Sequence, residues 1–230
     1  MQKQTHRDKQ LQELKEKLMR MASLAETMID QAIRELVERD ERAAERVPQY
    51  EDEVNRLQIE IDELALEFLA TQQPVARDLR CIVAMTRINS ELERIGDLVI
   101  NITECVHVLA SQPPLKPLVD IPRMAELARR MVRESIDALV REDVALAQAV
   151  ILRDDEVDAL KDQVLRELLT YMMADPQSIE RGLALILISR HLERIGDHAT
   201  NIAEDVIYMI QGRDVRHPRL AREGTSDERH

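Results

Sequence analysis

The feature that most constrains this chain is an internal repeat with a constant spacing. Five positions of the first half are matched 103 positions later, namely Val37, Asp40, Asp52, Val54 and Leu57 by Val140, Asp143, Asp155, Val157 and Leu160. A second register, with a spacing of 100, relates the last predicted helix of each half. Self-similarity at a fixed period indicates one structural unit used twice, so the two halves should share one fold.

Apolar residues recur in each half at alternating steps of three and four, which is typical of helices packed in a bundle. The chain has three Tyr, one Phe and no Trp, so it is poor in the aromatic residues that favour strands. We therefore expect an all-α protein of six helices without a sheet. The first helix is expected to end near Val47, where Pro48 marks a bend, and the third to run from about 75 to 110. The sixth is expected from about 178 to 211.

A proline-rich segment, SQPPLKP at 111–117, separates the two halves. Proline lacks the amide donor that a helix needs, so the segment is interpreted as a linker. The predicted domains are a first three-helix repeat over 1–111, a linker over 112–118, a second three-helix repeat over 119–211 and a polar, disordered tail over 212–230. Two tandem three-helix bundles of a spectrin-like kind are the simplest architecture, and one fused six-helix array is the alternative.

Charge and composition argue against several classes of protein. The formal net charge is −12, and no cluster of Lys and Arg interleaved with aromatics offers a groove for nucleic acid. Apolar runs are too short for a membrane span, and the first residues lack the apolar core of a secretion signal. We therefore expect a cytoplasmic protein without direct membrane insertion. Cys81 and Cys105 lack CxxC spacing and are interpreted as reduced structural thiols.

The sequence LERIGD occurs at 92–97 and again at 192–197, each time on the last helix of a repeat. Side chains three and four positions apart share a helix face, so the polar residues of this region form a stripe opposite the apolar face. The candidate metal ligands on these stripes are Glu93, Asp97 and Asn101 in the first repeat and Glu193, Asp197 and Asn201 in the second. Glu104 and Glu204 continue the stripes.

Carboxylates four residues apart on a helix are close enough to repel each other and to share a cation. Oxygen ligands suit hard cations, so the spacing predicts one surface metal site in each repeat. The competing interpretation is an ordinary solvated acidic face paired with Arg94 and Arg194. Gly96 and Gly196 lie beside the apolar face, where close helix packing is the expected reason for a residue without a side chain.

Catalytic signatures are absent from the sequence. Di-iron carboxylate enzymes need two Glu-x-x-His pairs, whereas only Glu104 and His107 form such a pair, and the second repeat has Ile207 in place of the histidine. No phosphate-binding glycine loop, HExxH motif or nucleophile elbow occurs. His191 and His198 flank the second motif without counterparts in the first, so they are either accessory to that site or bystanders.

At these residues the chain resembles the PhoU family of bacterial phosphate uptake. The resemblance covers both repeats, and its most specific part is the pair of LERIGD motifs, each followed by Asn-Ile. Segments similar to QPVARDLR at 73–80 and LTYMM at 169–173 also occur in members of that family. The resemblance implies a PhoU-like fold of two three-helix bundles, frequent homodimers and a metal site on each third helix. The implied cofactor is multinuclear iron or another cation such as Mn, Mg or Zn, to which Asp52 and Asp155 could also contribute.

The function implied by the resemblance is negative regulation of phosphate uptake and of the phosphate regulon. Such a protein would link the ATPase subunit of the phosphate ABC transporter to a sensor histidine kinase, without catalysis. We expect the acidic stripes to present the docking surface, with bound metal neutralising their self-repulsion. Two alternatives remain open from the residues alone: a metal-dependent enzyme of hydrolytic or redox type, and a purely structural helical protein.

Overall fold

The computed structural model describes residues 2–39 and 42–216, and everything below refers to these residues. They form six α-helices and one short 3-10 helix, and no strand occurs among them. The elements are α1 (Gln2–Glu38), α2 (Val47–Gln72), α3 (Arg77–Ala110), α4 (Asp120–Arg141), α5 (Val144–Ala174), η1 (Pro176–Ser178) and α6 (Ile179–Gln211). The all-α prediction and the three-plus-three helix order are confirmed. Of the predicted tail, residues 217–230 lie outside the described part.

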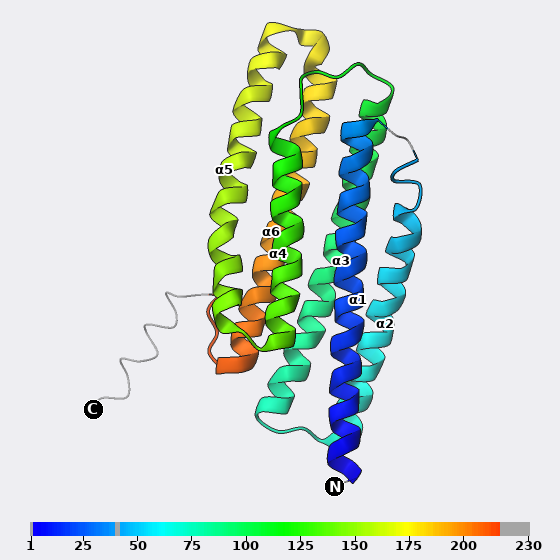
Figure 1. Cartoon of the computed structure of the whole chain (residues 1–230), viewed down its shortest axis with the longest axis vertical. Helices are drawn as coiled ribbons and strands as arrows, with labels where there is room; N and C mark the ends of the chain where they lie inside the picture. The colour runs from blue at the N-terminus through cyan, green and yellow to red at the C-terminus, as the bar shows by residue number, and fades with distance from the viewer. Residues whose placement is uncertain (1, 40–41, 217–230) are drawn as a thin grey trace, which may run out of the picture.

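The helices form an elongated array in which α2 and α5 flank the two sides (Figure 1). The α1 and α4 helices lie in front of α3 and α6, and α3 and α6 make the most extensive contact in the molecule. Successive contacts of α3 at Glu91 and Arg87 are with His198 and Asp205 of α6, so these two helices are antiparallel. As a consequence, the α2–α3 turn and the α5–α6 turn lie at opposite ends of the molecule (Figure 1).

Two helix boundaries differ from those predicted. The first helix ends at Glu38, well before the expected Val47, and the next residue, Arg39, has a left-handed φ of 57°. Pro48 does not mark a bend between helices but lies in the first turn of α2, where a proline costs no hydrogen bond. The third helix begins at Arg77, after Ala76 with a φ of 47°.

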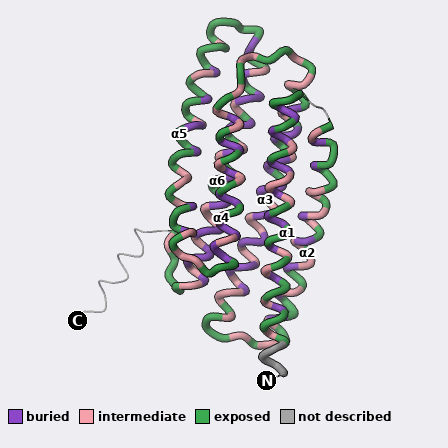
Figure 2. Tube along the Cα trace, viewed as in Figure 1, coloured by how far each residue is buried: buried purple, intermediate pink, exposed green. Residues whose placement is uncertain are grey.

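One continuous apolar core runs through both repeats. Buried side chains from all six helices belong to a single cluster, with the buried sides of the helices facing one another (Figure 2). Phe68 of α2, the chain's one phenylalanine, is fully buried in it. The tandem three-helix arrangement is therefore present, but the two bundles are fused side by side along their length.

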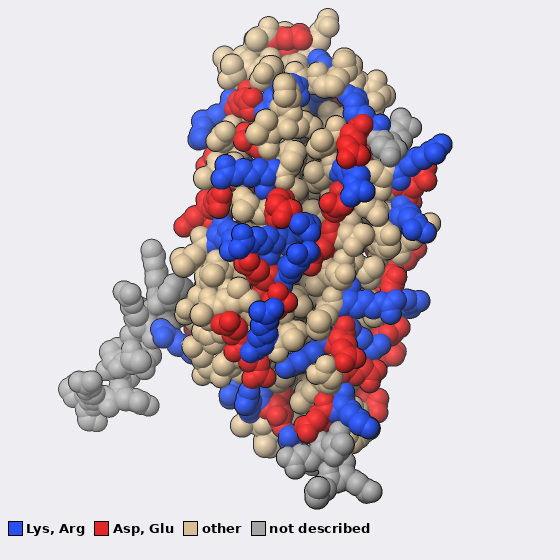
Figure 3. Space-filling view, in the orientation of Figure 1, with Lys and Arg blue, Asp and Glu red and all other residues tan. Residues whose placement is uncertain are grey.

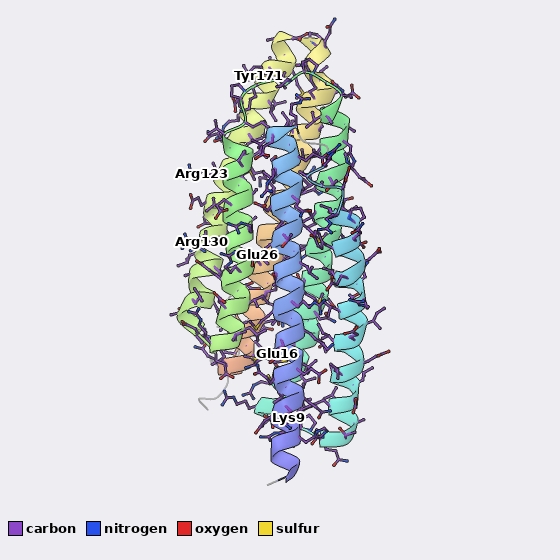
Figure 4. All side chains as sticks on the ribbon, turned by 45° about the vertical axis from the view of Figure 1, so that its right-hand side comes forward. Lys9, Glu16, Glu26, Arg123, Arg130 and Tyr171 are labelled. Atoms are coloured by element: carbon purple, nitrogen blue, oxygen red, sulfur yellow. The ribbon has the colours of Figure 1, made fainter. Side chains whose placement is uncertain are left out.

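Ion pairs close the front seam between the repeats. Glu26 of α1 pairs with Arg129 and Arg133 of α4. Figure 4 labels Glu26 and, at a similar height, Arg130, which follows Arg129 in the sequence. Acidic and basic side chains alternate over this face (Figure 3), so most of its charge is compensated locally. Within the described residues, no helix combines the length and apolarity that crossing a membrane requires.

Candidate metal-binding sites

The first repeat places its motif carboxylates along the groove between α3 and α2. Glu93 is half-buried, whereas Asp97 and Asn101 are exposed, as the helical spacing predicts. Glu51 of α2 lies close enough to add negative potential at Glu93. Burial and the nearby Asp97 charge, with a smaller contribution from Glu51, raise the pKa of the Glu93 carboxyl above its ordinary value. The site is thus an acidic cluster in which burial and like charge disfavour the ionised form of Glu93.

The second repeat builds a more acidic version of the same cluster between α5 and α6. Asp154 and Asp158 of α5 face Glu193 and Asp197 of α6. Burial, together with the charges of Asp197 and Asp158, raises the pKa of Asp154 to about 6. Burial and the Glu193 charge also raise the pKa of Asp197. Four carboxyl groups from two helices therefore share one groove.

A lysine from α5 enters this second cluster. The Lys161 amino group donates hydrogen bonds to Asp158 and Glu193, each at 2.9 Å. These bonds raise the pKa of Lys161, which keeps it charged. In the first repeat, 103 positions earlier, the corresponding residue is the neutral Gln58. The second repeat therefore carries a built-in cation that the first repeat lacks.

Asn201, predicted as a further ligand, makes its contact across the repeat boundary. Its amide donates to Glu91 Oε2 of α3 at 3.0 Å, and His198 Nδ1 lies 2.6 Å from the same oxygen. Burial alone would raise the pKa of Glu91, but the hydrogen bonds from His198 and Asn201 outweigh it and hold that pKa below its ordinary value. His198 and Asn201 thus both contribute to the contact between α3 and α6. Asn101, the residue of the first repeat that matches Asn201, is exposed.

The two motif glycines differ in how closely their neighbours approach. A Cβ added at Gly96 would lie 3.6 Å from the nearest atom, in Val54, which is ordinary contact. At Gly196 it would lie 3.2 Å from the Asp154 carboxylate oxygen, which is tighter. The close-packing explanation therefore holds at Gly196 and is wrong at Gly96, where the structure has room for a methyl group.

The oxygen donors of both clusters are of the type that hard cations prefer, but their positions do not form a coordination site. Both clusters offer oxygen donors whose crowding a cation would relieve. Among the described residues, however, no three His, Cys, Asp or Glu side chains converge on a point suited to a metal ion. A metal would therefore require the carboxylates to rotate inward and, in the second repeat, to release Lys161.

The acidic side chains that face the motif helices are not the ones that the sequence suggested. Asp52 and Asp155 are exposed, and the acidic side chains that face the motif helices are those one position earlier, Glu51 and Asp154. The available signal was the buried positions Val54 and Val157, because the residues three positions before them lie on the flank of the core face. Lys161 carried no signal of its own, since a lysine on a helix is ordinarily solvated.

Comparison with known proteins finds the same family and the same fold elsewhere. The family model described as "PhoU domain" matches twice, at residues 18–106 and 121–206. A relative from Aquifex aeolicus is 41% identical over 216 residues, which cover 94% of this chain and 98% of the relative. One from Pseudomonas putida is 39% identical, over 93% of this chain and 84% of the relative. Both are named phosphate-specific transport system accessory protein PhoU homologs.

Two solved structures share the architecture. The crystal structure of PhoU from Pseudomonas aeruginosa has a TM-score of 0.85 and 37% identity, covering 90% of this chain and 99% of that one. A protein from Streptococcus pneumoniae, described as the phosphate transport system regulatory protein PhoU, has a TM-score of 0.83 and 25% identity, over 91% of this chain and 99% of that one. The similarity therefore extends over nearly the whole length of both proteins.

Proposed function

The chain belongs to the PhoU family, and from that premise we propose that it is a regulatory accessory protein of phosphate transport. In this proposal it acts in the cytoplasm as a metal-binding adaptor, links the phosphate ABC transporter to a sensor histidine kinase, and represses the phosphate regulon while phosphate is plentiful. The observation that carries the proposal is the match to a named accessory protein over 94% of this chain and 98% of the relative.

The relatives are named as accessory or regulatory proteins and not as enzymes, and we propose no catalytic role. The partners would be the transporter's ATPase subunit and the cytoplasmic part of the kinase. A homodimer is part of the proposal, because the family resemblance implies one. The acidic stripes would contribute to partner recognition through complementary charge, which sets specificity and association rate more than affinity.

In the first repeat, Glu93 and Asp97, with Glu51 beside them, would hold a cation such as iron, manganese, magnesium or zinc. When bound, the ion would supply positive charge to a cluster of like charges. The raised pKa of Glu93 supports this role, because it reflects burial and the adjacent Asp97 charge. In the second repeat, Asp154, Glu193 and Asp197 would do the same in competition with Lys161.

The regulatory part is tested in a strain whose own copy of the gene is deleted. We expect a reporter of the phosphate-starvation response to become active in phosphate-rich medium and to be silenced again by the parental chain. A reporter that stays silent after deletion would exclude the repressor role.

The metal part is tested by thermal unfolding of metal-stripped protein with and without Mg²⁺, Mn²⁺, Zn²⁺ and iron. A specific ligand raises the midpoint by mass action. The comparison variant carries alanine at Glu93, Asp97, Glu193 and Asp197 and should lose the effect. If no ion stabilises the parent, the metal-binding proposal fails while the regulatory one stands on its own test.

A further inference from the structure

Large apolar side chains are exposed where α5 and α6 meet at their common turn. On α6 they follow one face at four-residue steps, and on α5 two more lie four residues apart on the face that continues from Asp154, Asp158 and Lys161. We call these residues the apolar end surface: Leu165, Leu169, Ile179, Leu183 and Leu187, with exposed fractions of 37, 44, 44, 50 and 44%. Figure 4 marks this end of the molecule by Tyr171.

The α5 and α6 helices pack closely against each other beneath this surface. A Cβ added at Gly182 of α6 would lie 2.8 Å from the Met172 side chain of α5, so the backbones are close there. The exposed side chains of α5 and α6 therefore stand on two helices that pack directly against each other at this end. Contiguous apolar patches on soluble proteins commonly mark interaction sites.

Two arginines continue the same face of α6 beyond Leu187. Arg190 and Arg194 are exposed, and within the described residues neither takes part in a hydrogen bond or ion pair. They lie beside His191, whose Nδ1 is buried without a partner, and their charges help to lower the pKa of that imidazole, after burial itself. The face therefore changes along α6 from apolar to basic, and among the described residues neither arginine is held in an ion pair.

The matching face of the first repeat keeps part of the apolar stripe, since the exposed Leu79 and Leu66 match Ile179 and Leu169, but it lacks the unpaired arginines. Leu187 corresponds to Arg87, which pairs with Asp205 and lies over the Tyr208 ring. Arg194 corresponds to Arg94, which pairs with Glu91, and Arg190 corresponds to Ser90. The combination of an apolar stripe and unpaired cations thus belongs to the second repeat.

We infer that the apolar end surface, with Arg190 and Arg194, is a docking site for an amphipathic partner helix that has acidic residues at one end of its apolar face. The stretch from Ile179 to Arg194 spans about 22 Å at 1.5 Å per residue, which matches roughly four turns of a partner helix. The partner's apolar face covers the leucines, and its carboxylates pair with the arginines. The inference rests on the proposed function only in that a regulatory adaptor needs a protein partner.

Other occupants fit this surface less well. Residues 217–230 contain Leu220 as their only large apolar side chain, so they cannot cover five exposed apolar residues. An anionic membrane would present negative charge to the whole face, including Asp154, Asp158 and Asp197, whereas a partner helix places its carboxylates only beside Arg190 and Arg194. Pairing of the surface with itself in a second copy is the third occupant, and the sedimentation measurement below separates it from a partner helix.

The test uses two synthetic peptides of about sixteen residues, which share a leucine face and carry either Glu or Lys at the flanking positions. Fluorescence anisotropy with the full chain should show the acidic peptide binding at least about tenfold more tightly than the basic one, and less so at high salt. The double variant Leu183→Gln, Leu187→Gln should weaken binding of the acidic peptide about tenfold. Arg190→Glu should remove the preference for acid.

The matched control is Leu66→Gln, Leu79→Gln, which changes two exposed leucines of the first repeat, 66% and 41% exposed. It should leave binding of the acidic peptide unchanged. Circular dichroism melting of each variant verifies folding, and the single change Arg190→Glu on the surface removes no apolar contact. Equal binding of both peptides, or equal loss in the control, overturns the inference.

Two further measurements separate the alternatives. Sedimentation that shows a dimer dispersed by Leu183→Gln, Leu187→Gln would assign the surface to a second copy, and binding of anionic vesicles lost in the same variant would assign it to lipid; either result overturns the inference. The purified ATPase subunit and kinase domain are tested in parallel. If neither binds the parent while the acidic peptide does, the adaptor function fails and the docking surface stands.

Discussion

The acidic groove of the first repeat and that of the second start from the same LERIGD motif and reach different electrostatic states. In the first, the charges of Asp97 and Glu51 both act on Glu93, and the neutral Gln58 stands at the position that matches Lys161. In the second, more carboxylates gather and Lys161 bonds to two of them. The difference teaches that a repeated motif fixes where a site lies, whereas the neighbouring helix determines what charge it holds.

The largest expected effect concerns the asymmetric contact between α3 and α6. Replacing Glu91, 13% exposed, by leucine leaves His198 and Asn201 without their buried acceptor. We expect the free energy of unfolding at pH 7 to fall by about 2–3 kcal/mol. Because the pKa of Glu91 is lowered in the folded state, its contribution is present above pH 4.5 and is lost as the pH falls through the folded value.

The matched change in the second repeat is His191→Leu. It removes a buried ring nitrogen that has no partner, so stability should change by less than about 1 kcal/mol or increase. Urea unfolding of both variants between pH 4 and 8 measures the contrast. Equal losses of unfolding free energy in the two variants would mean that Glu91 and His191 contribute equally to the contact between α3 and α6.

The next effect concerns Lys161, the cation that the second acidic cluster contains and that Gln58 replaces in the first. Lys161→Met should destabilise the protein by about 1–2 kcal/mol at pH 8, because it removes two charged hydrogen bonds at a partly exposed site. The same variant should gain more thermal stability from Mn²⁺ or Mg²⁺ than the parent does. Introducing the cation by Gln58→Lys should reduce any metal effect of the first repeat, and a midpoint shift unaffected by either change would contradict the proposed competition.

A smaller effect depends on pH and on Asp154. The folded-state pKa of about 6 lies above the ordinary 3.8, so the folded protein binds more protons than the unfolded one between these values. Stability should therefore decrease as the pH rises from about 4 to 6. Asp154→Asn should raise stability by about 1 kcal/mol at pH 7.5, after allowance for solvent screening, and change little at pH 4. A pH-independent gain would remove titration as the cause.

The smallest expected effect compares the two motif glycines. Gly96→Ala should stabilise the protein by about 0.5–1 kcal/mol through helix propensity, because the new methyl group meets only ordinary contacts. Gly196→Ala should gain less or lose stability, since its methyl group approaches the Asp154 carboxylate. Thermal midpoints of the two variants give the ranking, and a larger gain at Gly196 would refute the packing difference.

Much of the fold followed from periodicity, because apolar residues at three- and four-residue steps determine which helix faces are buried. The end of α1 was missed since Arg39, a residue without a turn signature, adopts the left-handed conformation there. The fusion of the two bundles was not decided from sequence either. An apolar side chain on α3 can pack against its own repeat or against the other one. The apolar pattern alone therefore does not distinguish two separate bundles from one fused array.

The candidate site was predicted in part. The helices that carry Glu93 and Glu193 were identified, because the helical spacing places both residues off the apolar face. Their neighbours on α2 and α5 depended on the rotation of one helix against another, and an error of one residue exchanged Glu51 for Asp52. The role of Asn201 depended on a contact between repeats, and no pattern within one repeat encodes it.

Because both repeats are encoded in one chain, the residues of the two acidic clusters can differ independently. A symmetric pair of identical subunits must carry a lysine at both equivalent positions or at neither. Here Gln58 and Lys161 are encoded separately, so one groove can hold its own cation while the other is left to recruit one. Under the proposed metal-binding function, covalent duplication would allow a single polypeptide to combine two different thresholds for the same kind of ion.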